Sequence, residues 1–322
     1  MKKVKIGVVG TGYVGNVHAG IYARDERVEI SALYDIIEER AVRTAKRVGG
    51  RVCSSRDELL DHCDAVLVCA PNRTHLEIAR AAVAAGKHVF CEKPFAIGIE
   101  DAKDLLGIAN SGPGVFQVGH SRRFAPAYLK LKELLSDDRP HSAHIKMNRG
   151  ELKIPEWTGD VSVTGGFLYE TTIHFLDMLR FQFGELEELV AYGSQHEYPE
   201  LDDFSVIAKF KSGFHCTFAT SSDASWLFPF ERIEVFCHHR TIVAEEMLRV
   251  FDCRGLGADS VTYSFHMTEE DFRRGFIQED AAFIDCILNS TPPPVSAFDG
   301  YKAVELVESV YTAIRTGNPV RF

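Results

Sequence analysis

The sequence has no extended run of basic residues, and its overall charge is acidic. Among its 322 residues, 46 are Asp or Glu and 36 are Lys or Arg, so the formal net charge is -10. Proteins that bind nucleic acid or an anionic membrane normally present a basic face. The composition therefore argues against both kinds of partner.

A long apolar segment is also missing. The N-terminal MKKVKIGVVG places two lysines before an apolar run, as a secretory signal does, but this run has about six residues and breaks at Gly10 and Gly12. It is too short for the apolar region of a signal and far too short to cross a bilayer. We expect it to be the first β-strand.

The eight cysteines include no CxxC pair, and several lie in apolar runs such as AVLVCA. A free thiol in such a run packs as a small hydrophobe, so a reducing cytoplasm is expected. Cys237-His238-His239 suggests zinc, but adjacent residues of a strand point to opposite faces, and no second cluster has ligand spacing. We expect no metal site.

Residues 1–120 alternate short β-rich runs with helical stretches. The β-rich runs are continuously apolar, as in VKIGVVG, AVLVCA and HVFCE. This pattern predicts an α/β domain with a doubly wound parallel sheet covered on both faces. The clearest helix runs from about Thr74, a plausible N-cap, to Ala85, with Gly86 placed for the C-terminal cap.

Residues 121–322 have longer strands that alternate apolar and polar residues, such as FSVIAKF and ERIEVFC. Alternation predicts a second α/β domain with an open, largely antiparallel sheet that has one free face. We expect a homodimer or homotetramer to form through this sheet. A final helix at about 298–316 is expected to pack back on the first domain.

The most specific motif is GTGYVG, formed by Gly10, Thr11, Gly12, Tyr13, Val14 and Gly15. It follows an apolar strand and opens a helix, the context in which GxGxxG binds a dinucleotide. The glycines allow a tight turn, close approach of a pyrophosphate, and helix packing, with the phosphates at the helix N-terminus. The alternative is an ordinary glycine-rich turn.

Asp35 ends the strand-like VEISALYD about 20 residues after Gly15, where an adenosine-ribose ligand is expected. A carboxylate there accepts hydrogen bonds from both ribose hydroxyls and repels a 2′-phosphate. NAD is therefore the predicted cofactor, and NADP is less favoured. The alternative is that Asp35 only begins a turn.

With this loop, three further motifs make the chain resemble the Gfo/Idh/MocA oxidoreductases over essentially its whole length. They are Ala70-Pro71-Asn72-xx-His75, Cys91-Glu92-Lys93-Pro94 and Gly165-Gly166-xxx-Glu170-xxx-His174-xx-Asp177. The resemblance implies a Rossmann domain followed by an α/β domain with an open sheet, and substrates that are sugars, cyclitols or related polyols. It implies that Lys93 and His174 are catalytic and that the cofactor cleft is lined by Ala70, Pro71, Asn72, His75, Glu92 and Lys93.

One departure concerns the acid-base groups. Many polyol dehydrogenases of this family carry GGGxxxDxGxHxxD, whereas this chain has Glu170 where Asp is usual, followed by two threonines instead of a glycine. Glutamate keeps the carboxylate on an arm one methylene longer. Substrate placement is expected to differ accordingly.

Oxidation of a secondary alcohol needs a base for the hydroxyl proton while a hydride leaves. Lys93, beside a cationic nicotinamide and partly desolvated, is expected to have a lowered pKa and to exchange that proton. His174 titrates near neutrality, and Glu170 at i−4 is expected to bind substrate or fix the imidazole tautomer. The alternatives are a surface lysine, a buried structural histidine and a solvated glutamate.

Two further residues are weaker candidates for substrate binding. Arg122, in GHSRRFAP, is expected to contact nicotinamide, substrate or an anionic group on the substrate, or else to form an ion pair between the domains, and the same holds for Arg123. Trp157 is expected to stack on a sugar face or to plug an interface.

The leading hypothesis is an NAD-dependent dehydrogenase acting on CH–OH groups of a sugar, an inositol-like cyclitol or a sugar derivative. One alternative is an NAD-dependent glycosidase that oxidises its substrate transiently. Another is a cofactor-binding regulator without catalysis, against which the presence of both Lys93 and His174 argues.

Overall fold

The computed structural model describes residues 3–148, 156–225, 230–257 and 259–322. The chain forms two compact units. Unit 1 comprises Met1–His120 and Phe276–Val304, and unit 2 comprises Ser121–Gly275 and Glu305–Phe322. Among the described residues, no helix combines the length and hydropathy that crossing a membrane requires.

Unit 1 is built on a six-stranded sheet of order β3-β2-β1-β4-β5-β6, in which each described strand is parallel to its neighbours. This order is the doubly wound arrangement that the strand and helix alternation predicts. The strands are β1 (Val4–Val9), β2 (Val28–Tyr34), β3 (Arg51–Val52), β4 (Ala65–Val68), β5 (His88–Glu92) and β6 (Phe116–Gly119). The helices are α1 (Tyr13–Tyr22), α2 (Glu38–Val48), α3 (Arg56–Asp61), α4 (His75–Ala84), α5 (Ile99–Ser111) and α10 (Phe276–Asn289), with a 3₁₀ turn at Asn72–Thr74.

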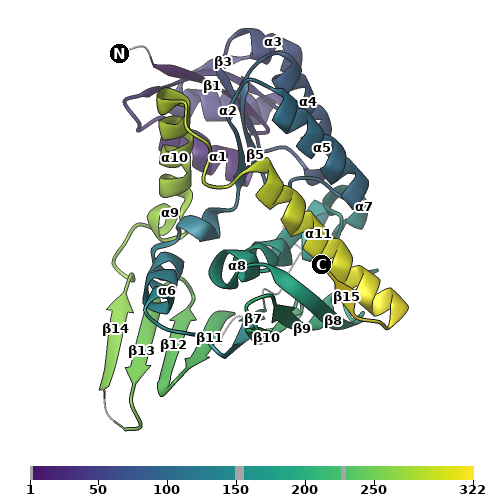
Figure 1. Cartoon of the computed structure of the whole chain (residues 1–322). Helices are drawn as coiled ribbons and strands as arrows, with labels where there is room; N and C mark the ends of the chain where they lie inside the picture. The colour runs from purple at the N-terminus through teal and green to yellow at the C-terminus, as the bar shows by residue number, and fades with distance from the viewer. Residues whose placement is uncertain (1–2, 149–155, 226–229, 258) are drawn as a thin grey trace. The chain divides into compact units, whose positions relative to one another are not determined.

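The core of unit 1 explains why these strands are continuously apolar. All four residues of β4 are buried, because helices cover both faces of a parallel sheet. Ile6 and Leu67 of the sheet cluster with Phe90 and with Phe283 of α10. Helix α10 packs beside α1 (Figure 1). A segment more than 150 residues after β6 therefore completes the core of unit 1.

The helix expected from Thr74 is confirmed with small changes. Helix α4 begins at His75 with Thr74 at the N-cap position, but the Thr74 hydroxyl donates to the carbonyl of Pro71 instead of capping the helix. Ile78, Ala79 and Ala82 form its buried stripe.

Unit 2 is built on a sheet whose described strands follow the order β14-β13-β12-β11-β7-β10-β9-β8-β15, seen side by side from β14 to β11 in Figure 1. The expected open, largely antiparallel sheet is confirmed, with the exception that β7 and β10 are parallel. The strands are β7 (Ser142–Met147), β8 (Leu186–Ser194), β9 (Asp203–Phe210), β10 (His215–Ser221), β11 (Glu231–Cys237), β12 (Arg240–Glu245), β13 (Arg249–Arg254), β14 (Asp259–Ser264) and β15 (Val320–Arg321).

Unit 2 also contains the helices α6 (Pro126–Ser136), α7 (Val161–Thr164), α8 (Ile173–Phe183) and α9 (Glu270–Arg273), with 3₁₀ turns at Ser121–Phe124 and Glu156–Gly159 and a π-helical turn at Leu168–Thr172. Helix α6 packs against β12 and β13 of the sheet. Phe175 of α8 stacks on Phe218 of β10, and Phe183 stacks on Phe214. Along β9 buried and exposed residues alternate, so the opposite face stays open.

The last long helix, α11 (Ala297–Thr316), agrees closely with the expected helix at about 298–316. Its first residues belong to unit 1, where the ideal Cβ position of Gly300 is crowded by Phe95 and Val118. Its remaining residues belong to unit 2, where Ile314 lies against Gly193.

Candidate functional site

The glycine loop joins β1 to α1 as the motif predicts. Gly10 has φ +88°, and a Cβ there would lie 2.6 Å from the backbone of Cys69 and Ala70. A Cβ on Gly15 would lie 2.0 Å from the carbonyl oxygen of Gly10. A Cβ on Gly12, in contrast, would meet no atom within 4 Å. Gly10 and Gly15 are therefore required by packing, whereas Gly12 leaves open space in front of the helix N-terminus.

Asn16, in the first turns of α1, holds the carbonyl groups of this loop. Its amide nitrogen donates to the carbonyl oxygens of Thr11 at 2.5 Å and of Gly12 at 2.9 Å. Its amide oxygen accepts from the hydroxyl of Thr44 and from the guanidinium of Arg47, each at 2.9 Å, both on α2. All the hydrogen-bonding capacity of this side chain is used to fix the loop.

Asp35 follows β2 directly and is hydrogen-bonded to the same loop. Its Oδ2 accepts from the backbone N–H of Thr11 at 2.8 Å and from the Thr11 hydroxyl at 3.0 Å, and its Oδ1 accepts from the N–H of Ile37 at 2.9 Å. The carboxylate is half-buried. Asp35 therefore lies beside the glycine loop, as expected.

The segment after β4 brings the backbone of Cys69 and Ala70 close to Gly10, and Pro71 and the 3₁₀ turn that begins at Asn72 follow directly. His75 is buried, and its ring nitrogens lie 2.8 Å from the carbonyl oxygen of Ala70 and 2.7 Å from that of Pro94. His75 thereby links the segment after β4 to the segment after β5.

Glu92 and Lys93 lie at the carboxyl end of β5. Oε2 of Glu92 accepts from the backbone N–H of Lys93 at 3.1 Å, and Oε1 lies 3.0 Å from Nε2 of His18 on α1. Burial alone would raise the pKa of Glu92, but the hydrogen bond and charge of His18 bring it below its ordinary value. The Lys93–Pro94 peptide bond is cis. Glu92 is 6% exposed, so it holds the backbone of Lys93 from within the core.

In unit 2, Glu170 and His174 lie on adjoining turns. Glu170 is in the π-helical turn at Leu168–Thr172, and His174 is the second residue of α8. His174 is 8% exposed and Glu170 is half-buried. A single π-helical turn inside an α-helix is frequent at functional sites, and the sequence spacing alone does not reveal it.

Arg122 and Arg123 are both buried in ion pairs within unit 2. Arg122 pairs with Glu231, which also accepts from the hydroxyl of Tyr128 at 2.9 Å. Arg123 holds Asp177 through two hydrogen bonds of 2.8 and 2.6 Å. The geometry favours the ion-paired alternative over substrate contact for Arg122, which is 5% exposed. Trp157 lies in the turn at Glu156–Gly159 and is 39% exposed.

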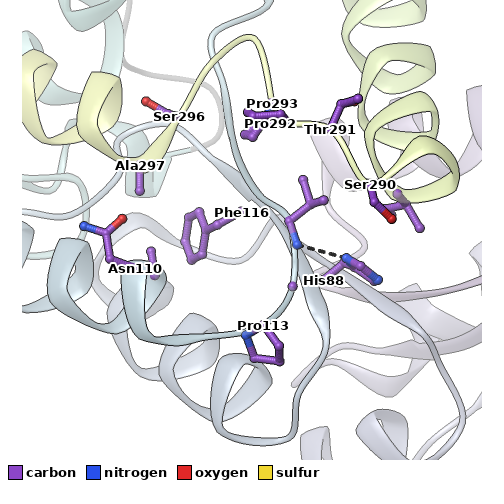
Figure 2. Close-up of a pocket in the computed structure, with 14 residues that line it drawn as sticks. His88, Asn110, Pro113, Phe116, Ser290, Thr291, Pro292, Pro293, Ser296 and Ala297 are labelled. Carbon is purple, nitrogen blue, oxygen red and sulfur yellow. Dashed lines mark hydrogen bonds between the residues drawn. The ribbon is translucent and has the colours of Figure 1, made fainter.

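A separate pocket of about 430 Å³ lies in unit 1 at the amino ends of the strands, opposite the carboxyl ends that carry Asp35 and Lys93 (Figure 2). It is lined by His88, which begins β5, and by residues on either side of the Pro292-Pro293 step. The N–H of Val115 donates to Nδ1 of His88 at 2.9 Å, the dashed line in Figure 2. Because β5 runs from His88 to Glu92, this pocket lies at the amino ends of the strands, away from the glycine loop and Lys93.

The geometry of unit 1 is suited to a dinucleotide. The open space at Gly12 adjoins the N-terminus of α1, where free N–H groups and the helix dipole favour a pyrophosphate. The Asp35 carboxylate lies beside the same loop for a ribose, and Lys93 lies at the strand edge beyond β5. These groups meet at the carboxyl ends of parallel strands, where ligands bind in open α/β sheets.

Three features of this site were missed in the sequence. They are the amide of Asn16, the buried His18 bound to Asp280 and Glu92, and the π-helical turn at Glu170. His18 was detectable in principle, because it follows Gly15 by three residues and so lies on the buried side of an apolar helix. Asn16 has partners on α2 as well as in the loop, and the partners of His18 lie on β5 and α10. No local sequence pattern identifies these distant partners.

Comparison with known proteins agrees with this geometry. Residues 4–120 match the family described as an oxidoreductase family with an NAD-binding Rossmann fold, and residues 132–322 match the C-terminal α/β domain of the same family. The chain is 30% identical over 317 residues to a myo-inositol 2-dehydrogenase of Thermotoga maritima, covering 94% of each chain. It is 26% identical to an inositol 2-dehydrogenase of Rhizobium meliloti, covering 97% of each.

Among solved structures, a probable dehydrogenase from Thermotoga maritima superimposes with a TM-score of 0.84 at 28% identity, covering 99% of this chain and 98% of the other. The two family matches together cover most of the sequence. The chain therefore belongs to the Gfo/Idh/MocA oxidoreductase family, with an NAD-binding Rossmann domain followed by the family's C-terminal α/β domain.

Proposed function

We propose that the protein is an NAD-dependent dehydrogenase that interconverts a secondary hydroxyl and a ketone on a cyclitol, a sugar or a sugar derivative. Two relatives matched over nearly their whole length are named inositol 2-dehydrogenases. Glu170 in place of the family aspartate favours a substrate that is seated differently from the substrates of the polyol dehydrogenases with that aspartate.

The observation that carries this proposal is the arrangement at one edge of the unit 1 sheet. Gly12 leaves room for a pyrophosphate, Asp35 presents a carboxylate beside it, and the backbone of Lys93 is fixed by Glu92 at the end of β5. A dinucleotide site and a proton-exchanging amine at the carboxyl ends of the same parallel sheet are what alcohol oxidation requires.

The glycine loop and Asp35 would hold NAD, which would supply the acceptor for the hydride. Lys93 orients the substrate hydroxyl and exchanges its proton. His174 is placed as a second proton-handling group, and Glu170 binds substrate hydroxyls or sets the tautomer of His174. We propose these three as the catalytic residues, with Lys93 in the leading role.

The test is a screen of inositols, sugars and sugar nucleotides with NAD and with NADP, followed by NADH absorbance. A dehydrogenase accumulates NADH with its substrate, and the Lys93→Ala variant does not. Release of an aglycone without net NADH would instead indicate a glycosidase that oxidises its substrate transiently. Tight NAD binding without turnover of any compound would indicate a regulator.

We also propose that the protein self-associates through the open face of the unit 2 sheet, as a homodimer or homotetramer. Ile207 of β9 and Tyr192 of β8 are 55% and 73% exposed on that face. Exposed apolar side chains on an uncovered sheet favour burial against a second copy. Each of the eight cysteines, all within the described residues, is a free thiol, which favours a reducing cytoplasmic location.

A further inference from the structure

Four ionisable side chains are buried together where α1, β5 and α10 of unit 1 meet. They are His18, Glu92, Glu279 and Asp280, and none is more than 6% exposed. Ionised groups removed from water are stable only when they are paired. The protonation of each member therefore matters to the fold and to the segment that carries Lys93.

The imidazole of His18 is fully engaged by two of the three carboxyl groups. Its Nδ1 lies 2.8 Å from Oδ1 of Asp280 and its Nε2 lies 3.0 Å from Oε1 of Glu92. Burial alone would lower the pKa of His18, but the charges and hydrogen bonds of Asp280 and Glu92 raise it well above its ordinary value. Each ring nitrogen of His18 thus faces a carboxyl oxygen, an arrangement that favours the imidazolium form.

Glu279 is the carboxyl group for which this arrangement provides no donor. Both of its carboxyl oxygens are buried, and neither has a hydrogen-bond partner among the described residues. One of them lies within 4.8 Å of the nearest atoms of His18 and Glu92. An ionised Glu279 would be a third buried carboxylate facing a single imidazolium.

Burial, followed by the charge of Glu92, raises the pKa of Glu279 well above its ordinary value. The other ionisable groups close to Glu279 do not offset this. Asp280 adds to the increase and His18 opposes it. Tyr22 of α1 and Cys69 after β4 also interact with the charge of Glu279, and both are neutral when protonated.

Glu92 has little freedom to move away from Glu279. An ideal Cβ on Gly119, the neighbouring residue of β6, would lie 2.6 Å from Oε1 of Glu92. The carboxyl group of Glu92 therefore fills the space above a glycine while it holds His18 on one side and the N–H of Lys93 on the other. A negative charge on Glu279 would act directly on this arrangement.

We propose that Glu279 is a neutral, protonated carboxylic acid in the native protein at neutral pH, and that it is a positioning residue whose neutrality keeps Glu92 on His18 and on the backbone of Lys93. The proton is held inside the core, and no cation is needed to balance the cluster. The effect on catalysis rests on the proposed function, whereas the protonation state does not.

The first test is infrared spectroscopy of the whole protein without NAD or substrate. The wild type should show the carbonyl stretch of a protonated carboxylic acid at neutral pH, and this band should be missing from Glu279→Gln. The control Asp285→Asn removes an exposed carboxylate from the same helix and should leave the band in place. A wild-type spectrum without a band that depends on Glu279 would overturn the proposal.

The second test is the pH dependence of unfolding. A group whose pKa is raised on folding contributes stability below its unfolded pKa, and this stability is lost as the pH rises through the folded pKa. Between about pH 4.3, the ordinary pKa of Glu, and the raised pKa of Glu279, the unfolding constant of the wild type should increase relative to Glu279→Gln. The increase should approach about tenfold per pH unit. If the unfolding constants of the wild type and of Glu279→Gln kept a constant ratio over this pH range, the inference would be contradicted.

Metal analysis of the purified wild type and Glu279→Gln proteins, after dialysis against a chelator, tests the competing explanation. We expect no stoichiometric metal in either protein. A metal ion held by the wild type and lost from Glu279→Gln would overturn the proposal, because a cation would then take the place of the proton.

The positioning role is tested by the pH profile of kcat/KM. As Glu279 ionises at alkaline pH, the wild type should lose kcat/KM that Glu279→Gln retains, since glutamine has a similar shape and stays neutral. If the wild type and Glu279→Gln lost kcat/KM equally at alkaline pH, the positioning role would be overturned. If the wild type turned over no polyol, the proposed function would fail, while the infrared and unfolding results would still decide the protonation of Glu279.

Discussion

Thr11 and Asp35 are joined by two hydrogen bonds that end on the same carboxylate oxygen. The backbone N–H of Thr11 donates at 2.8 Å and its hydroxyl at 3.0 Å, both to Oδ2 of Asp35. The second residue of the glycine loop is thereby tied to the end of β2. The carboxylate is fixed in place beside the loop, and its negative charge lies where the adenosine ribose of a dinucleotide is expected.

The first prediction concerns the choice of cofactor. A fixed carboxylate accepts hydrogen bonds from the ribose hydroxyls and repels a 2′-phosphate, so NAD should bind at least about tenfold more tightly than NADP, about 1.4 kcal/mol. Asp35→Ser should reduce the preference for NAD over NADP. The control Asp61→Asn, at the exposed end of α3, should leave this preference unchanged. Calorimetric titration of both cofactors measures the ratio. Equal affinities in the wild type would remove Asp35 as the ribose ligand.

The second prediction concerns Asn16. Its amide donates to two loop carbonyl groups, and each hydrogen bond of this kind contributes about 1 kcal/mol. Asn16→Ala should release the loop and weaken NAD binding by about tenfold, with a smaller effect on kcat at saturating NAD. Asn110→Ala, on the exposed side of α5, is the matched control. An unchanged NAD affinity would show that the loop keeps its shape without Asn16.

The third prediction concerns self-association. If the open face of the unit 2 sheet is an interface, Ile207→Asp should place an unpaired charge there and shift the protein toward a 36.0 kDa monomer. Met267→Asp changes another exposed apolar residue outside the sheet and should leave the assembly intact. Light scattering at micromolar concentration provides the measurement. A wild-type protein that is already monomeric there would refute the interface.

The sequence predicts those parts of the molecule whose signals are local. Continuous apolar runs such as β4 predict buried parallel strands, and the spacing of Gly10, Gly12 and Gly15 predicts a turn with one crowded and one open side. Strand β14 escaped prediction because nearly all of its residues are exposed and it shows no alternation. The order of the strands in the unit 2 sheet, including the parallel β7 and β10, depends on pairings that no local pattern encodes.

In the candidate site, too, features with a local sequence signal could be predicted and features that depend on distant partners could not. Asp35 and Lys93 stand next to strand ends that the apolar pattern reveals, so their location was predictable. The sequence could not predict whether Arg122 contacts a ligand or a carboxylate, because its partner Glu231 is 109 residues away in the sequence. The partners of His18 are 74 and 262 residues away, which is why the buried cluster became visible only in the structure.

The fourth prediction concerns His174 and Glu170. If His174 handles a proton, His174→Ala should lower kcat by roughly 10²–10⁴-fold. Glu170→Gln should raise KM by about tenfold with a much smaller change in kcat if the carboxylate binds substrate hydroxyls. The exposed change Glu187→Gln on β8 is the control. A lowered kcat with a displaced pH profile in Glu170→Gln would show instead that Glu170 tunes His174.

The last prediction separates catalysis from binding at Lys93. Its backbone N–H donates to Glu92, and the residue directly follows β5 at the carboxyl end of the sheet, where the dinucleotide is expected. Lys93→Ala should lower kcat by roughly 10²–10⁴-fold and leave NAD affinity nearly unchanged, because it removes the proton-exchanging amine but not the loop. Lys93→Arg keeps the positive charge but cannot release a proton near neutral pH, so it should remain impaired. Lys87→Ala, at the opposite end of β5, should behave as the wild type. Near-normal turnover in Lys93→Ala would mean that the chemistry takes place without this amine, and the proposed catalytic site would be wrong.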